Sequence, residues 1–372
     1  MSTKKNIVIV GGGSAGANAA KALSRTLDTS KYQLILINPL PYRIWLVATL
    51  RLVVSPQEEL KKDITLPYDK VFVNGNGKFV EGKVISFKAG KEGGSVTLES
   101  GEEIDYHILV LSQGATWSGP PGFPQTDSGV KEHISHLQSL FSKAKDIVLV
   151  GGGAVGLELA GELKDVYPDK KVTIVHGDKY LLNPSYPDKV RKSAEKSIRA
   201  RGVEVILDDF VDVSETKEVE GVTTRGGKEL KSADLVVQSR GPRPNTEFVA
   251  AALGEDSLSP LGLIRVKPTL QLKDHDNIFA AGDVIDWNEQ KQAAKSSGHG
   301  LLVAANIQAL LNKGALKPYK GATEMIVLTN GKDGGLAFFN ILWGITLGNW
   351  FAKLVKSKTL LVPLYKGEQG YA

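Results

Sequence analysis

The chain has 372 residues, of which 42% are apolar and 23% charged. This is the balance of a soluble globular protein of two to three domains, and it excludes a wholly disordered chain and a multi-pass membrane protein. A net charge of +5 favours anionic ligands or a membrane surface only mildly, and nucleic acid is not expected as a partner. The chain has no cysteine, which excludes disulfides, Cys-ligated metals and a thiol nucleophile. The six histidines are scattered, so no metal site is expected.

The N-terminal residues lead straight into an apolar strand at 7–10, which leaves no room for a signal peptide. Position 2 is Ser, where N-myristoylation requires Gly. We therefore expect a cytoplasmic protein, and peripheral contact with membranes or lipid droplets stays open.

An internal repeat follows, in which IVIVGGGSAG at 7–16 reappears as IVLVGGGAVG at 147–156. Each copy is a β-branched run, a G-x-G-x-x-G turn and a helical pattern, and a second strand comes next at 32–37 or 171–175. This context predicts a dinucleotide-binding unit twice over. A hydrolase nucleophile elbow centred on Ser14 is the competing interpretation, but the second copy has Ala154 there.

Each glycine of the repeat has a physical role. The first makes the tight turn, the second lets a pyrophosphate approach the backbone, and the third lets the helix pack closely on the sheet. The predicted ligands are Gly11, Gly13, Ser14 and Gly16 for one nucleotide and Gly151, Gly153 and Gly156 for the other.

Three later strands end in characteristic turns. Those at 108–117 and 235–246 end at glycines, Gly114 and Gly241, and are typical of crossovers between domains. The strand at 277–283 ends in Asp283, which can accept a hydrogen bond from a ligand hydroxyl or cap the following helix.

This order of segments resembles the two-dinucleotide-domain flavoprotein reductases, and most closely the apoptosis-inducing-factor-like flavoproteins of the ferroptosis-suppressor type. The segments that carry the resemblance are Gly153–Glu162, KQAAKSSGHGLLVAANI at 291–307 and KLVKSK at 353–358. It implies an α/β fold with two Rossmann-like domains, the second inserted in the first as in glutathione reductase, and a small C-terminal α+β segment. The expected boundaries are 1–117 and 246–320 for the FAD domain, 118–245 for the NAD(P) domain and 321–372 for the C-terminal segment.

The resemblance also implies an enzyme that passes hydride from NADPH or NADH through FAD to a quinone, at a membrane surface. Two other functions stay open: reduction of a small redox protein, and redox signalling with weak DNA binding. The first fingerprint, Gly114 and Asp283 would bind FAD, and the second fingerprint and Gly241 would bind NAD(P)H. The relatives begin Met-Gly, so membrane contact would have another origin here.

Further site residues follow from position and resemblance. Asn38 and His176 end the second strand of each unit, where a ribose hydroxyl or a 2′-phosphate would lie, and His176 with nearby lysines favours acceptance of NADPH. Glu158 and Glu162 are four residues apart and share one face of a predicted helix. The resemblance implies that they lie near the nicotinamide as catalytic candidates, and the alternative is that both are exposed carboxylates. The remaining assignments are Arg51, Lys291 and Gln292 to FAD, and Lys356 to the quinone site.

The aromatic-rich segment 336–352 and the lysines at 353, 356 and 358 are the least ordinary part of the chain. Aromatic residues beside lysines suit an interfacial segment on anionic lipid or a quinone entry channel at 336–358. A helix buried in the core or in a homodimer interface is the equally weighted alternative.

Overall fold

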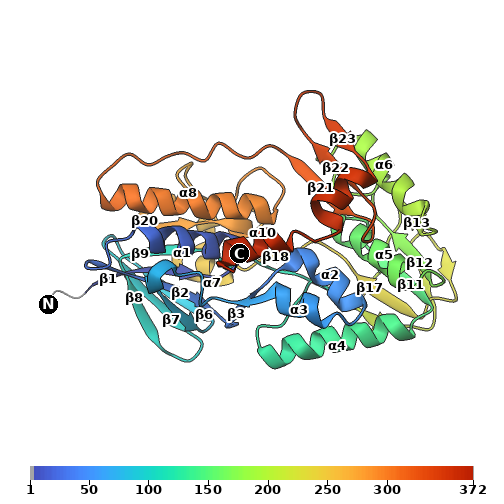
Figure 1. Ribbon diagram of the computed structural model, residues 1–372, viewed down its shortest axis with the longest axis horizontal. Helices are drawn as coiled ribbons and strands as arrows, with labels where there is room; N and C mark the ends of the chain where they lie inside the picture. Colours follow the sequence, from blue (N-terminus) through green and yellow to red (C-terminus); the bar gives the residue numbers. More distant parts are fainter. Residues whose placement is uncertain (1–3, 372) are drawn as a thin grey trace.

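A computed structural model describes residues 4–371, so Ser2, on which the myristoylation expectation rests, lies outside the described residues. The first sheet has the order β19-β20-β9-β1-β2-β5 and lies on the left of Figure 1. Apart from β19, which runs antiparallel to β20, its strands are parallel. Their bounds are β1 (Lys5–Val10), β2 (Tyr32–Asn38), β5 (Lys78–Glu81), β9 (Ile108–Leu111), β19 (Gln271–Leu272) and β20 (His275–Ala280).

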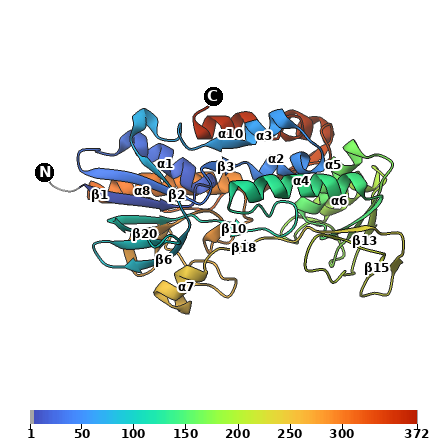
Figure 2. The ribbon, with the colours of Figure 1, turned by 90° about the horizontal axis from the view of Figure 1, so that it is seen from below.

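Two helices, α1 (Ser14–Thr26) and α8 (Ala293–Leu311), lie side by side over this sheet (Figure 1). They approach closely because Gly300 has no side chain: a Cβ there would lie 2.1 Å from the Ala15 carbonyl oxygen. The opposite layer is a smaller antiparallel sheet covered by α7 (Glu247–Leu253), seen in Figure 2. Its strands are β6 (Val84–Ala89), β7 (Gly94–Leu98) and β8 (Glu103–Tyr106).

The second sheet has the order β13-β12-β11-β17-β14 and forms the right half of Figure 1. It contains β11 (Asp146–Val150), β12 (Lys171–Val175), β13 (Glu204–Ile206), β17 (Leu235–Gln238) and the antiparallel β14 (Lys217–Glu218). Its helices are α4 (Asp127–Lys143), α5 (Ala154–Val166) and α6 (Asp188–Arg199), and a small hairpin joins β15 (Val222–Thr223) to β16 (Glu229–Leu230). The strands β11, β12 and β17 are almost entirely buried, as expected of a parallel sheet covered on both faces.

The chain leaves the first half at β10 (Ala115–Thr116) and returns at β18 (Arg243–Pro244). These two crossovers pair antiparallel, Ala115 opposite Pro244 and Thr116 opposite Arg243. The second Rossmann-like unit is therefore inserted in the first, and the predicted fold class is confirmed.

Between β2 and β5, the chain forms β3 (Tyr42–Ile44), α2 (Leu46–Val54), α3 (Glu58–Ile64), β4 (Thr65–Pro67) and a 3-10 turn (Val73–Gly75). Two more 3-10 turns follow later, at Glu255–Ser257 and Gly282–Val284. The helix α2 packs on both α4 and α5, and so joins the two halves.

The C-terminal segment spans both halves. Its sheet, β21 (Met325–Thr329), β22 (Gly335–Phe339) and β23 (Ile345–Leu347), packs on α5 and α6. It continues through α9 (Asn349–Ala352) and a short π-helix (Lys353–Ser357), called the π-turn below. The last helix is α10 (Val362–Gln369), which ends near the middle of the molecule (Figure 1). The residues 336–352 thus form strands and one short helix rather than a long helix. In the part of the chain that the structure describes, no helix has the length and apolarity to cross a membrane.

Candidate functional site

A cavity of about 440 Å³ lies where the two halves and the C-terminal segment meet. This volume is within the range of small-molecule sites. The walls come from the first glycine turn, the segment 38–47, the strand end 112–117, the start of α5, and the turn and helix start around 282–296. Among the lining residues are Gly11, Gly13, Ser14, Asn38, Arg43, Gly114, Glu158, Asp283, Lys291, Gln292 and Lys356.

The first glycine turn forms a cradle in this cavity. A Cβ added at Gly13 would meet no described atom within 4 Å, so the turn faces open space. At Gly16, by contrast, a Cβ would lie 1.9 Å from the Gly11 carbonyl oxygen. The open turn begins α1, whose first N–H groups and dipole favour an anion. These residues therefore fit the pyrophosphate of FAD.

The second turn repeats this geometry. Gly153 again faces open space, and a Cβ at Gly156 would lie 2.0 Å from the Gly151 carbonyl oxygen. Gly11 and Gly151 have φ values of +95° and +117°, which favour glycine. The residues of this turn fit the pyrophosphate of a second dinucleotide.

Two serines that the sequence analysis missed close the turns. The Ser112 hydroxyl donates to the Val10 and Gly11 carbonyl oxygens at 2.9 and 3.0 Å. The Ser239 hydroxyl donates to the Val150 and Gly151 carbonyl oxygens at 3.0 and 2.8 Å. The repeat extends to these positions as Ser112-Gln-Gly114 and Ser239-Arg-Gly241, a signal that the sequence does contain. Gly114 lines the cavity and Gly241 does not.

Asn38 and His176 also occupy equivalent places. Asn38 Oδ1 accepts the Gly12 N–H at 3.0 Å, and His176 Nδ1 accepts the Gly152 N–H at 3.1 Å. Because Nδ1 accepts, the proton of a neutral His176 ring is on Nε2. Burial lowers the His176 pKa and so favours the neutral ring in the protein without its nucleotide.

Arg43 is a cavity residue that the sequence analysis missed. Its guanidinium donates to the Ser14 hydroxyl at 2.8 Å and lies 2.9 Å from a Glu368 carboxylate oxygen. The rings of Trp45 and Tyr365 hold it at 5.3 and 5.1 Å from their centres. Arg43 therefore brings a buried positive charge to the start of α1.

Asp283, Lys291 and Gln292 meet on another wall of the cavity. Burial raises the pKa of Asp283, whose Oδ1 accepts the Ser296 hydroxyl at 3.1 Å. The Lys291 ammonium donates to the Ile285 carbonyl oxygen at 2.7 Å, and burial lowers its pKa. The Gln292 side chain donates to the Met325 carbonyl oxygen at 2.7 Å.

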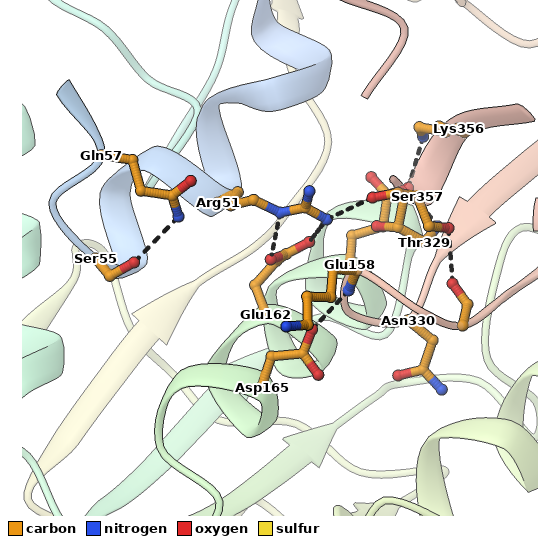
Figure 3. Close-up of polar contacts among 12 residues, drawn as sticks. Arg51, Ser55, Gln57, Glu158, Glu162, Asp165, Thr329, Asn330, Lys356 and Ser357 are labelled. Carbon is orange, nitrogen blue, oxygen red and sulfur yellow. Dashed lines mark hydrogen bonds and ion pairs between the residues drawn. The ribbon is translucent and has the colours of Figure 1, made fainter. Parts of the chain in front are cut away.

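Glu158 and Lys356 form an ion pair on the cavity wall (Figure 3). The Lys356 ammonium donates to Glu158 Oε1 at 2.6 Å and to the Val327 carbonyl oxygen at 2.9 Å. Glu158 Oε1 also accepts the Thr329 N–H at 2.9 Å. The pair thus brings together α5 and the C-terminal segment, and presents both an acid and a base to the cavity.

Arg51 and Glu162 pair with each other instead of lining the cavity (Figure 3). Burial raises the pKa of Glu162, although the Arg51 guanidinium beside it favours the charged form. Of the two predicted carboxylates, Glu158 is therefore the one at the cavity.

Comparison with known proteins agrees with this geometry. The model of the pyridine nucleotide-disulphide oxidoreductase family matches residues 5–300. The chain is 44% identical over 313 residues to the FAD-dependent oxidoreductase FVFD30 of Flammulina velutipes, covering 84% of this chain and 97% of the relative. It is 30% identical over 374 residues to ferroptosis suppressor protein 1 of Xenopus tropicalis, covering 98% and 96%.

Among solved structures, the fold is similar to that of the sulfide:quinone oxidoreductase from Aquifex aeolicus. The TM-score is 0.74 at 20% identity, over 98% of this chain and 92% of the other. The protein belongs to the pyridine nucleotide-disulphide oxidoreductase family, and is a flavoprotein enzyme with FAD as its cofactor and NAD(P)H as its substrate.

Proposed function

We propose that the protein passes the reducing equivalents of NAD(P)H to a quinone at a membrane surface. The observation that carries the proposal is the Glu158–Lys356 pair, on the wall of a cavity that the first glycine turn, α5 and the C-terminal segment share. FAD, when bound, supplies the two-electron redox chemistry. Gly13, Ser14, Arg43 and Asp283 would hold it.

The chain's own residues would act on the acceptor. The side chains of Lys356 and Glu158 are only 12% and 11% exposed, so water screens their charges weakly. A quinone carbonyl within hydrogen-bond distance of Lys356 Nζ would have its developing negative charge stabilised and would receive a proton from that ammonium. Glu158 Oε1 accepts a hydrogen bond from the same ammonium at 2.6 Å and so holds it in place at the cavity wall.

The hairpin between β22 and β23 supports the membrane part of the proposal. Leu342 and Trp343 at its tip are 80% and 97% exposed, and Trp350 and Leu354 nearby are 66% and 72% exposed. Large apolar side chains that are exposed to this extent are typical of a surface that binds a membrane or another protein. With the exposed Lys358 in the same segment, anionic lipid is the partner that this surface suits.

Steady-state oxidation of NADH with a short-chain ubiquinone analogue tests the acceptor. We expect Lys356→Met and Glu158→Gln to lower the quinone-dependent kcat by about 100-fold, the usual contribution of a positioned proton donor. Lys353→Met is the matched control, because Lys353 lies in the same turn and pairs with the exposed Asp333 at 2.7 Å. Unchanged turnover in both variants, or fast turnover only with a small redox protein, would refute the proposal.

A further inference from the structure

The Arg51 side chain joins three segments that are far apart in the sequence (Figure 3). From α2, its Nε and Nη2 donate to the two carboxylate oxygens of Glu162 on α5, at 2.9 and 2.8 Å. Nη2 also donates to the Ser357 carbonyl oxygen at 2.8 Å. The side chains of Arg51 and Glu162 are 11% and 4% exposed, so the pair is buried.

Ser357 is the residue directly after Lys356, in the π-turn Lys353–Ser357. Its carbonyl group is held by Arg51, and its hydroxyl donates to the Gly334 carbonyl oxygen at 2.7 Å. The backbone beside Lys356 is thus fixed from two directions. The ammonium group at the far end of the Lys356 side chain is fixed separately by Glu158.

One face of α5 makes both sets of contacts. Glu158 and Glu162 are four residues apart, and residues at this spacing lie on the same side of a helix. Glu158 holds the Lys356 side chain directly, and Glu162 holds the neighbouring backbone through Arg51. The position of the ammonium in the cavity therefore depends on α2, α5 and the C-terminal segment together.

The stability of the folded protein does not by itself explain why Arg51 and Glu162 form a buried ion pair. Removing two charges from water costs about as much as their attraction returns, and burial indeed raises the pKa of Glu162. What a guanidinium supplies is a rigid planar fork that contacts several acceptors in fixed geometry. A displacement of about 1 Å in a reacting group costs on the order of 100-fold in rate.

We propose that Arg51 and Glu162 are positioning residues for the reduction of the acceptor, and that they set the place of Lys356 in the cavity. Neither residue lines the cavity, so both act through the π-turn. This inference rests on the proposed role of Lys356.

The test is the double variant Arg51→Met/Glu162→Leu, which removes the pair without leaving one buried charge uncompensated. Replacing such a pair by apolar residues is often neutral or stabilising, so we expect the thermal unfolding temperature and the FAD content to stay at wild-type values. We expect the quinone-dependent kcat to fall by about 10- to 100-fold, with NADH reduction of the flavin unchanged. Arg51→Lys, which keeps the charge but not the fork, should also lose at least part of this rate.

The matched control is Arg225→Met/Asp212→Leu. This pair in the inserted unit has the same two-pronged geometry, with contacts of 2.9 and 2.5 Å, but its side chains are 62% and 67% exposed. It should leave kcat unchanged.

Combination with Lys356→Met separates the outcomes. If Arg51 and Glu162 act through Lys356, the triple variant is no slower than Lys356→Met alone. Wild-type kcat in the Arg51/Glu162 double variant, while Lys356→Met is slow, would overturn the positioning role and leave the proposed function intact. Wild-type kcat in Lys356→Met would overturn both.

Discussion

Gly13 and Gly153 occupy the same place in the two glycine turns. We expect alanine at either position to weaken nucleotide binding without destabilising the unliganded protein. Their φ values of −68° and −75° suit alanine, and an added Cβ would meet no described atom within 4 Å. Gly→Ala at such a site stabilises the unliganded protein by about 0.4–1 kcal/mol, because it restricts the unfolded chain. The same methyl group would occupy the space where the pyrophosphate must approach.

Crowding of this kind costs about 1–3 kcal/mol, which corresponds to a dissociation constant about 5- to 150-fold higher. We expect Gly13→Ala to weaken FAD binding by that factor, measured by titrating the apoprotein with FAD and following the flavin fluorescence. Gly153→Ala should keep FAD and raise the KM for NADH instead. In both variants the unliganded protein should unfold at or above the wild-type temperature.

Gly16→Ala is the control, because its Cβ would lie 1.9 Å from the Gly11 carbonyl oxygen and distort the turn itself. It should destabilise the protein even without FAD. Wild-type FAD affinity in Gly13→Ala would refute the reasoning, since the pyrophosphate would then not lie on this turn.

Three further perturbations probe other parts of the site. The His176 pKa is lowered in the fold, so the stability it contributes is present above the unfolded value of about 6.5 and is lost as the pH falls. Urea unfolding between pH 7 and 5 should thus show a smaller loss of stability in His176→Asn than in wild type. The same variant should change the ratio of kcat/KM for NADPH to that for NADH by less than about threefold. A tenfold loss of kcat/KM with NADPH would indicate that His176 is charged. Asp283→Asn should raise the FAD dissociation constant at least tenfold by removing the carboxylate acceptor in the cavity, and an unchanged constant would remove Asp283 from the site. Leu342→Ser/Trp343→Ser should lower sedimentation with phosphatidylserine vesicles at least tenfold without changing quinone turnover in solution, whereas equal binding would place the membrane contact elsewhere.

The glycine turns could be predicted from the sequence because their geometry is local. A strand, a glycine at positive φ and a helix start follow one another within ten residues, and the same string occurs twice. The position of Asp283 could be predicted in the same way, because it follows the buried strand His275–Ala280 within a few residues and lines the cavity.

Arg51 and Glu162 show where such prediction stops. They are 111 residues apart, and nothing in either segment indicates that the two side chains meet. The guanidinium that does line the cavity belongs to Arg43, eight positions earlier, and its contact with Glu368 depends on the docking of α10. These contacts follow from tertiary packing, which no local pattern encodes.

The aromatic segment 336–352 was ambiguous for a different reason. Its apolar residues suit a strand as well as a helix, and a short apolar run does not distinguish the two. The turn at 340–344, with Leu342 and Gly344 at positive φ, resolves it into a hairpin whose tip is exposed.

The proposed passage of electrons from NAD(P)H to a quinone is tested most directly by anaerobic double-mixing stopped flow at 450 nm. The FAD-loaded protein is mixed first with NADH or NADPH and then with a short-chain ubiquinone analogue. We predict rapid loss of the flavin absorbance, followed by rapid recovery that depends on the quinone concentration and is slowed about 100-fold in Lys356→Met. Rapid loss followed by recovery that does not respond to quinone would contradict the proposed acceptor.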